Sequence, residues 1–459
     1  MKVNSNYLFV AILSLSFLSC NKKEFLDERP NSDVFVPTTL EDFQALLDNE
    51  IALSVTPTLG ELSADNYYLT ADFWKQTIIP KEHNAYIWAE KVFEGESTVE
   101  DWNAPYKQVL YANVILDGLK KVPVTSGNLQ QWNNMKGSAL FIRAYAFYNL
   151  AQVFALPYNA TTAGNDLGIP LKLTPNVDEV VHRSKLDETY AQILADLLEA
   201  KDLLPAEVSY AYRNRPNKPA AFAQLARVYV SMRLYDKAGA YADSCLHLKD
   251  TLMDYNNFKD LFTLRPFDKY NPETLYQTKF IETGVLKAGS LTRGCFVDTI
   301  LYRSYSPNDL RRSLFYQGNS FYANMKGGYT GTLLFFTGLA TDEMYLVRAE
   351  CRARAGDMEG AQKDLNYLLQ RRYQTGTFIP YTTSTPNLQD TILNERRKEM
   401  PFRGVRWTDI RRLNMEDPNI TPMRILDGLP YTLPVNSPKY ALPIPPDAMS
   451  TGHYIQNER

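Results

Sequence analysis

Residues 61–74 are the part of the chain whose residue types best suit the binding of a small polar ligand. They read ELSADNYYLTADFW, which is too polar for a core strand. The candidate ligand-binding residues of this stretch are Asp65, Asn66, Tyr67, Tyr68, Phe73 and Trp74. Flat aromatic rings stack on sugar faces, and amide or carboxylate groups hydrogen-bond to the hydroxyls. A glycan therefore suits this set and a peptide suits it nearly as well; packing of the same rings against a helical scaffold is the alternative.

Catalytic motifs are absent from the sequence, which argues against an enzyme. HExxH, GxSxG, Walker and GxGxxG patterns do not occur. The four histidines are scattered without metal-ligand spacing and no CxxC pair is present, so we expect no metal and no cofactor. Any two of the many carboxylates could meet in a cleft as glycosidase partners, but the sequence singles out no pair. The sequence favours a binding protein and leaves a hydrolase as the less favoured alternative.

The cysteine at position 20 has the setting of a lipidation site. One basic residue, Lys2, precedes an apolar run at 7–18, which is too short for a comfortable membrane span and is typical of a signal peptide. Ser19 and Cys20 follow this run and resemble a bacterial lipobox, in which cleavage precedes the cysteine and that residue is acylated. An ordinary secretory signal is the alternative. We expect residues 1–19 to be a lipoprotein signal peptide, and acyl chains such as palmitate on Cys20 to anchor the protein in lipid.

The composition is that of a globular protein with a large core. The 459 residues carry a formal net charge of −3, so no basic field predicts binding to nucleic acid. Cys245, Cys295 and Cys351 are too few and too widely spaced for a disulfide framework. The 30 Tyr and 22 Phe residues are an unusually large aromatic share, and we expect most of these rings in the core.

Helical periodicity recurs along the chain, so we expect a mainly α-helical fold. Apolar residues follow helical stripes at 39–47, 102–119, 140–154 and 186–204. Trp102 lies on one of these stripes and is therefore expected in the core.

Two stretches have the residue spacing of a tetratricopeptide helix pair. In 219–248, large residues, small residues and tyrosines recur at this spacing. The small residues would let two antiparallel helices approach closely. Residues 342–370 repeat the pattern, with Gly356 and Asp357 at the turn. Because roughly a hundred residues separate the two stretches, an unbroken solenoid is not expected. We predict tetratricopeptide-like helix pairs that form a scaffold interrupted by insertions.

The segments outside the helix pairs predict long irregular regions. Residues 251–335 are rich in Asn, Gly, Tyr and Thr and show little periodicity, while the proline-rich segment 414–459 excludes a long helix. Irregular segments of this length are usually functional.

The resulting domain prediction is simple. A lipidated tether at 20–36 leads into a single domain at 37–459. We divide this domain into an N-terminal helical part with ligand-facing loops (37–250), the irregular insertion (251–335) and a C-terminal part (336–459).

Five segments, in order along the chain, carry a resemblance to a known family. Residues 395–413 read ERRKEMPFRGVRWTDIRRL, which closely resembles the signature of the SusD/RagB family of outer-membrane nutrient-binding lipoproteins. The start CNKKEFLDERP (20–30), the helix FIRAYAFYNLAQVFALPY (141–158), the segment NDLRR (308–312) and the tail ALPIPPDAMSTGHYIQN (441–457) resemble further family segments.

The resemblance implies a SusD-like fold and a role in nutrient capture. Such a protein sits on the outer membrane, faces the cell exterior and passes a glycan to a SusC-like TonB-dependent transporter without chemistry of its own. A peptide-binding member of the family, a lipid-anchored hydrolase and an adaptor that holds protein partners in tetratricopeptide grooves are the alternatives. Residues 21–24 read NKKE, which departs from the acidic run that family members often carry after the cysteine. Ligand residues vary within the family, so none is carried over.

The signature segment itself alternates in charge around Gly404. Its charged residues are Glu395, Arg396, Glu399, Arg403, Arg406, Asp409 and Arg412. Bidentate Arg–carboxylate pairs would lock this corner of the fold, with Trp407 packed beneath. An arginine site for an anionic ligand is the alternative.

Overall fold

The computed structural model describes residues 37–289, 294–417 and 419–459. The predicted signal peptide, Cys20 and nearly all of the tether lie outside the described residues. Residues 38–459 form one compact unit. Among the described residues, no helix is both long and apolar enough to cross a membrane.

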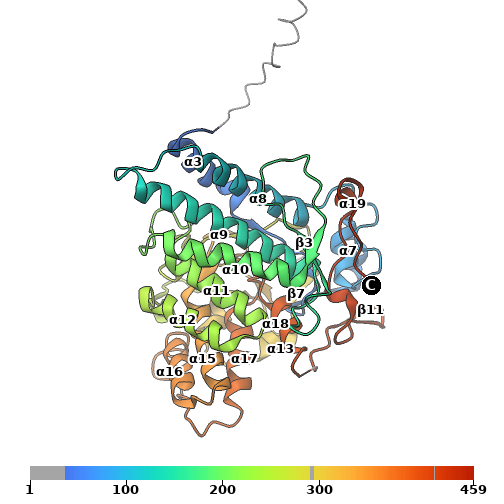
Figure 1. Ribbon diagram of the computed structural model, residues 1–459. Helices are drawn as coiled ribbons and strands as arrows, with labels where there is room; N and C mark the ends of the chain where they lie inside the picture. The colour runs from blue at the N-terminus through green and yellow to red at the C-terminus, as the bar shows by residue number, and fades with distance from the viewer. Residues whose placement is uncertain (1–36, 290–293, 418) are drawn as a thin grey trace, which may run out of the picture. The chain divides into compact units, whose positions relative to one another are not determined.

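The described chain is mainly α-helical, as the periodicity predicts, and its longest helices pack side by side in chain order (Figure 1). These helices are α8 (Glu100–Leu119), α9 (Leu129–Phe154), α10 (Leu186–Leu203), α11 (Lys218–Ser231) and α12 (Tyr235–Leu248). A second group follows an insertion: α15 (Thr341–Arg354), α16 (Met358–Leu369) and α17 (Leu388–Glu399). Trp102, on α8, is 4% exposed and belongs to the core, as predicted.

The two tetratricopeptide-like helix pairs are neighbours in space although they are far apart in sequence. The pair α11–α12 packs on the pair α15–α16 through a contact between α12 and α15. Gly239 makes this approach possible, because a Cβ atom at its position would lie 2.9 Å from Cβ of Cys351 on α15. The helix pairs therefore stack as one scaffold, although the insertion separates them in sequence.

The remaining helices are short and sit at the ends and edges of the scaffold. They are α3 (Leu40–Leu47), α4 (Glu50–Leu53), α5 (Leu59–Ser63), α6 (Ala71–Lys75), α7 (Pro80–Tyr86), α13 (Thr299–Arg303), α14 (Leu310–Phe315), α18 (Arg406–Leu413) and α19 (Pro446–Gly452). Thr39 and Asp42 form a capping box at the start of α3, which satisfies backbone N–H groups that the first turn leaves free.

Strands in the described chain occur as short two-stranded pairs. The pairs are β1 (Val55–Thr56) with β6 (Lys279–Phe280), β2 (Tyr67–Leu69) with β7 (Cys295–Val297), β3 (Leu167–Pro170) with β4 (Arg183–Lys185), β5 (Thr274–Tyr276) with β10 (Leu339–Ala340), β8 (Tyr316–Gln317) with β9 (Asn324–Met325), and β11 (Met423–Leu426) with β12 (Leu429–Thr432). Among the strand pairs that the structure describes, only β1–β6 is parallel. The pairs β1–β6 and β2–β7 join the N-terminal part to the insertion, so they position residues 61–74 against it.

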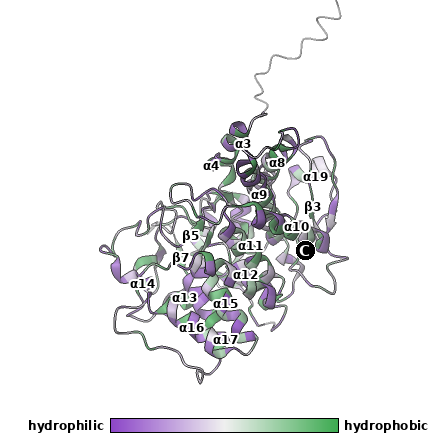
Figure 2. Ribbon diagram, turned by 60° about the vertical axis from the view of Figure 1, so that its left-hand side comes forward, coloured by the Kyte–Doolittle hydropathy of each residue, from purple (hydrophilic) through white to green (hydrophobic). Residues whose placement is uncertain are grey.

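Many charged residues lie on the second helix group. In Figure 2, α15, α16 and α17 carry many purple, hydrophilic residues. Several of these side chains are nonetheless buried, among them Glu343, Glu350 and Glu399. Buried charges need partners within the protein, and the next subsection describes them.

Candidate functional site

Residues 61–74 run from the end of α5 through β2 to α6. Residues 61–64 are buried, and burial alternates along β2. On β2, Tyr67 is 1% exposed and its hydroxyl donates to the carbonyl oxygen of Leu62 at 2.8 Å. Asn66 is also 1% exposed, and its amide donates to Oε1 of Glu61 at 2.7 Å. Both side chains are therefore fully enclosed and hydrogen-bonded within the protein.

The carboxylate of Asp65 forms a salt bridge with an arginine of the signature segment. Nε and Nη2 of Arg406 lie 2.6 and 2.8 Å from the two carboxylate oxygens of Asp65, and Arg397 lies 3.5 Å away. Burial acts to raise the pKa of Asp65, but the charge and hydrogen bonds of Arg406 outweigh it and hold that pKa well below its usual range. The carboxylate is therefore ionised and bound to its own protein.

Tyr68, Phe73 and Trp74 keep part of their rings accessible to solvent. Tyr68 faces away from Tyr67 because side chains alternate along a strand. Its ring packs on Phe296 of β7, the residue directly opposite it in the strand pair, with centroids 5.7 Å apart. The tyrosine hydroxyl donates to the carbonyl oxygen of Phe321.

The insertion adds three aromatic residues beside Tyr68 that the sequence did not single out. Phe296 contacts Tyr322 edge to face, with centroids 5.2 Å apart. Tyr322 and Phe321 are each 57% exposed, and the guanidinium of Arg303 lies 4.8 Å from the Phe321 ring. We call the group Tyr68, Phe296, Phe321 and Tyr322 the aromatic surface.

The loop that carries Phe321 and Tyr322 is built to hold them in place. The side-chain oxygen of Asn319 accepts hydrogen bonds from the backbone N–H groups of Phe321 and Tyr322 at 3.0 and 3.1 Å. Such a turn holds the backbone that carries two successive side chains. Gly318 precedes it with φ of 101°, where a Cβ atom would lie 2.2 Å from the carbonyl oxygen of Tyr322. An aromatic pair directly after the sequence Gly-Asn-Ser is the signal that could have identified these residues.

Trp74, which follows Tyr68 closely in the sequence, belongs to a second aromatic group that is partly exposed. Its ring stacks on His83 with centroids 4.0 Å apart, and its indole N–H donates to the His83 carbonyl oxygen at 3.0 Å. Tyr431 of the β11–β12 hairpin lies 6.2 Å from the indole ring. Lys75 pairs with Asp427 in the turn of that hairpin, which ties α6 to it.

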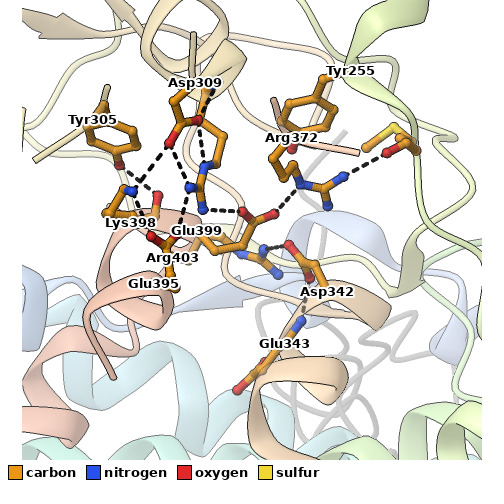
Figure 3. Close-up of polar contacts among 12 residues, drawn as sticks. Tyr255, Tyr305, Asp309, Asp342, Glu343, Arg372, Glu395, Lys398, Glu399 and Arg403 are labelled. Atoms are coloured by element: carbon orange, nitrogen blue, oxygen red, sulfur yellow. Dashed lines mark hydrogen bonds and ion pairs between the residues drawn. The ribbon is translucent and has the colours of Figure 1, made fainter. Parts of the chain in front are cut away.

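The charged signature segment is engaged in a buried set of ion pairs, part of which appears in Figure 3. Arg311 is fully buried and binds Asp309 through two hydrogen bonds of 2.9 and 2.7 Å. It also donates to Glu395 at 2.6 Å and to Glu399 at 3.0 Å. We call the connected group the ion network; its members are Glu273, Asp309, Arg311, Arg372, Glu395, Lys398 and Glu399.

The ion network joins the insertion to the second helix group. Arg372, just after α16, donates to Glu399 of α17 at 2.7 Å and to Glu273 in the insertion at 2.8 Å. One further pair repeats the pattern: Arg412 of α18 binds Glu350 through two hydrogen bonds of 2.6 and 2.8 Å. Trp407 is 2% exposed beside Tyr440. The predicted Arg–carboxylate pairs are therefore present and Trp407 is buried, and the arginines of these pairs are neutralised by carboxylates of the same chain.

Burial also raises the pKa of two carboxyl groups in this region. It raises the pKa of Glu61 to about 7, against the lowering effect of the Asn66 and Gly404 hydrogen bonds. It raises the pKa of Glu273 as well, although Arg372 acts in the opposite direction. Within the described residues, no group of three or more His, Cys, Asp or Glu side chains could hold a metal ion.

Two family models match the chain, one on each side of the insertion. Residues 24–230 match the model described as "starch-binding associating with outer membrane", and residues 341–456 match the model described as "SusD family". The chain belongs to the SusD/RagB family. Together the two matches include the first helices, the predicted site segment and the signature segment. Proteins of this family are associated with the outer membrane and bind nutrients.

Solved structures show the same SusD-like fold. A SusD superfamily protein from Bacteroides thetaiotaomicron VPI-5482 matches with a TM-score of 0.73 and 22% identity, covering 92% of this chain and 100% of that one. A SusD-like carbohydrate binding protein from Bacteroides vulgatus ATCC 8482 gives 0.64 and 18%, covering 91% and 97%. The surface glycan-binding protein A from Bacteroides uniformis gives 0.68 and 16%, covering 91% and 99%. No curated protein sequence matches the chain.

Proposed function

We propose that this protein is a lipid-anchored glycan-binding protein of the cell surface that passes its ligand to a SusC-like TonB-dependent transporter. The single observation that carries the glycan part is the aromatic surface, where the partly exposed rings of Tyr68, Phe321 and Tyr322 surround the buried ring of Phe296 on two strands and one turn. Rigid rings lose little freedom when a sugar stacks on them, so they bind at low entropic cost. Membership of a sugar-binding family agrees with this function.

The ligand-contacting residues of the predicted segment would be Tyr68, Phe73 and Trp74. Asp65, Asn66 and Tyr67 would position them, because these three side chains are bound to Arg406, Glu61 and Leu62. Tyr322 and Phe321 would complete the surface from the insertion. We assign no catalytic residue, since the buried carboxylates of the ion network are each paired with arginine or lysine.

A glycan array with matched tyrosine variants tests the binding site. We expect Tyr322→Ala to weaken binding of the best glycan about tenfold, because a stacked ring is worth roughly 1–1.5 kcal/mol. Tyr210→Ala is the control, since Tyr210 is 65% exposed in a different loop. The same proteins should be screened on a peptide array. Peptide binding that Tyr322→Ala abolishes, with no glycan binding, would support the peptide-binding alternative instead.

Two cellular experiments test the anchor and the partner. Mass spectrometry of the mature protein should find an acylated Cys20 as its first residue, and Cys20→Ser should release the protein from the membrane fraction. Affinity purification of the tagged wild-type protein from membranes should recover a large TonB-dependent transporter. A free Cys20 thiol, or recovery of no transporter, would contradict the respective part of the proposal. Release of reducing sugar from the bound glycan would favour a hydrolase.

A further inference from the structure

An open pocket of about 400 Å³ lies on the first long helix, α8. Its other walls are the segment that follows β3, at 171–177, and the C-terminal helix α19. None of its lining residues belongs to the aromatic surface or to the ion network. Its volume falls in the range of pockets that hold small ligands and is enough for one or two sugar units.

Hydrogen bonds between distant parts of the chain fix the walls of this pocket. Asn113 on α8 donates to the carbonyl oxygens of Lys172 and Thr174 at 2.9 and 3.1 Å, which holds the 171–177 segment against the helix. Asn103 donates to Asp447 of α19 at 2.8 Å. The pocket therefore exists before any ligand binds, and little reorganisation is needed to fill it.

The floor and sides of the pocket are aromatic. Tyr106 and Tyr454 lie 4.9 and 6.0 Å from the ring of Trp102, and both tyrosines are only partly buried. The Tyr106 hydroxyl donates to the carbonyl oxygen of Pro170 at 2.9 Å, so this ring cannot turn away. Rings held in this way offer flat faces to a sugar.

Two lysines give the pocket its charge. Among the residues that the structure describes, neither Lys107 nor Lys172 forms an ion pair, and neither ammonium group donates a hydrogen bond. The one carboxylate that lines the pocket, Asp447, accepts a hydrogen bond from Asn103 through Oδ2, while its Oδ1 is buried without a partner in the described chain. One negative charge therefore stands against the two lysine charges. The pocket thus joins aromatic faces to two ammonium groups without internal partners, a combination that fits a ligand with a sugar ring and a negative charge.

We propose that this pocket binds a carboxylate-bearing saccharide, a uronic acid or a short oligosaccharide that contains one. The sugar ring lies against Tyr106 and Tyr454, and the carboxylate pairs with Lys107 and Lys172. This site is separate from the aromatic surface, so one chain holds an acidic glycan at two points, or holds a second sugar while the first is transferred.

Saturation-transfer NMR on the folded protein tests this site with matched sugar pairs. The probes are galacturonic acid against galactose and glucuronic acid against glucose, each pair differing only in the carboxylate. We expect one uronic acid to bind at least fivefold more tightly than its neutral partner, and added salt to reduce the difference. Equal binding of acid and neutral sugar, or no binding of either acid, would overturn the proposal.

Four variants locate the binding. Lys107→Gln combined with Lys172→Gln should weaken uronic acid binding at least fivefold, while Lys259→Gln, an exposed lysine elsewhere, should not. Val177→Trp should block the pocket; Val177 is 66% exposed, so the larger ring leaves folding intact. Tyr322→Ala should leave uronic acid binding unchanged. If Tyr322→Ala abolishes it and Val177→Trp does not, the acid sits on the aromatic surface; this inference is then wrong while the proposed function stands.

Discussion

The ion network and the aromatic surface differ in whether their side chains find partners within the protein. Arg311 has no exposed surface and meets three carboxylates, so every charge there has a partner from the same chain. Phe321 and Tyr322 have more than half of their area exposed and no ring packed on their outer faces in the described chain. A group that is satisfied within the protein contributes to stability, whereas a rigid group left open is available to a ligand.

This difference also separates two interpretations of the arginine-rich signature. The segments 308–312 and 395–413 meet at Arg311, Glu395 and Glu399, far apart in sequence but joined in space. An anionic ligand at this point would have to displace carboxylates that are covalently part of the chain and already in place. The signature therefore marks how the insertion is held on the helical scaffold. Variants that affect only stability or only binding are the direct way to test this division.

The largest expected effect is the loss of Arg311. Arg311→Met removes the cation that Asp309, Glu395 and Glu399 share and leaves buried carboxylates without it. We expect the free energy of unfolding to fall by about 3–5 kcal/mol, the usual cost of removing one partner of a buried ion pair. Denaturant unfolding followed by circular dichroism measures it. Arg265→Met, at an exposed position, is the control and should change stability by under about 0.5 kcal/mol.

A smaller effect is expected from the titration of Glu61. Its pKa is about 7 in the folded protein and near 4.5 when unfolded, so the folded state binds the proton more tightly. The stability that this proton gives the folded state is fully present below pH 4.5 and is lost as the pH rises through 7. It amounts to at most about 3 kcal/mol. Glu61→Gln should flatten the pH dependence of unfolding between these values. The exposed Glu41→Gln should reproduce the wild-type profile, and identical profiles for all three proteins would contradict the assignment.

Asp65 lies on the border between the two regions, because it sits in the predicted ligand segment but pairs with Arg406. Asp65→Asn keeps the shape and removes the charge, so we expect a loss of about 2 kcal/mol in unfolding free energy. Its folded pKa is lowered from 3.8, so its contribution is present above that pH and disappears as the pH falls below it. A variant that loses glycan binding at unchanged stability would instead make Asp65 a direct ligand contact.

The helical scaffold was predictable because its signals are local. Helix stripes and the small residues of the tetratricopeptide-like pairs lie within about thirty residues of one another, and they fix how α11 meets α12 and how α15 meets α16. That the two pairs stack through Gly239 and Cys351 was not predictable, since no local pattern reports a contact across the insertion.

The candidate site was predictable only in part, for the same reason. The stretch 61–74 stands out by composition, but composition cannot show which face of a strand each residue takes. The burial of Tyr67 and the exposure of Tyr68 follow from the alternation along β2, and β2 exists because β7 pairs with it more than two hundred residues later. Phe296, Phe321 and Tyr322 come from that distant segment and were missed.

The smallest stability effect is expected at the aromatic surface itself. Tyr322→Ala removes a ring that is 57% exposed and contacts Phe296 at its edge. We therefore expect the unfolding free energy to change by less than about 1 kcal/mol, while glycan binding falls about tenfold. Thermal unfolding and binding measured on one preparation give both numbers. If Tyr322→Ala lost several kcal/mol of stability, the ring would be a structural element like Arg311. The contrast between the two regions would then fail, because exposure would no longer distinguish a binding group from a structural one.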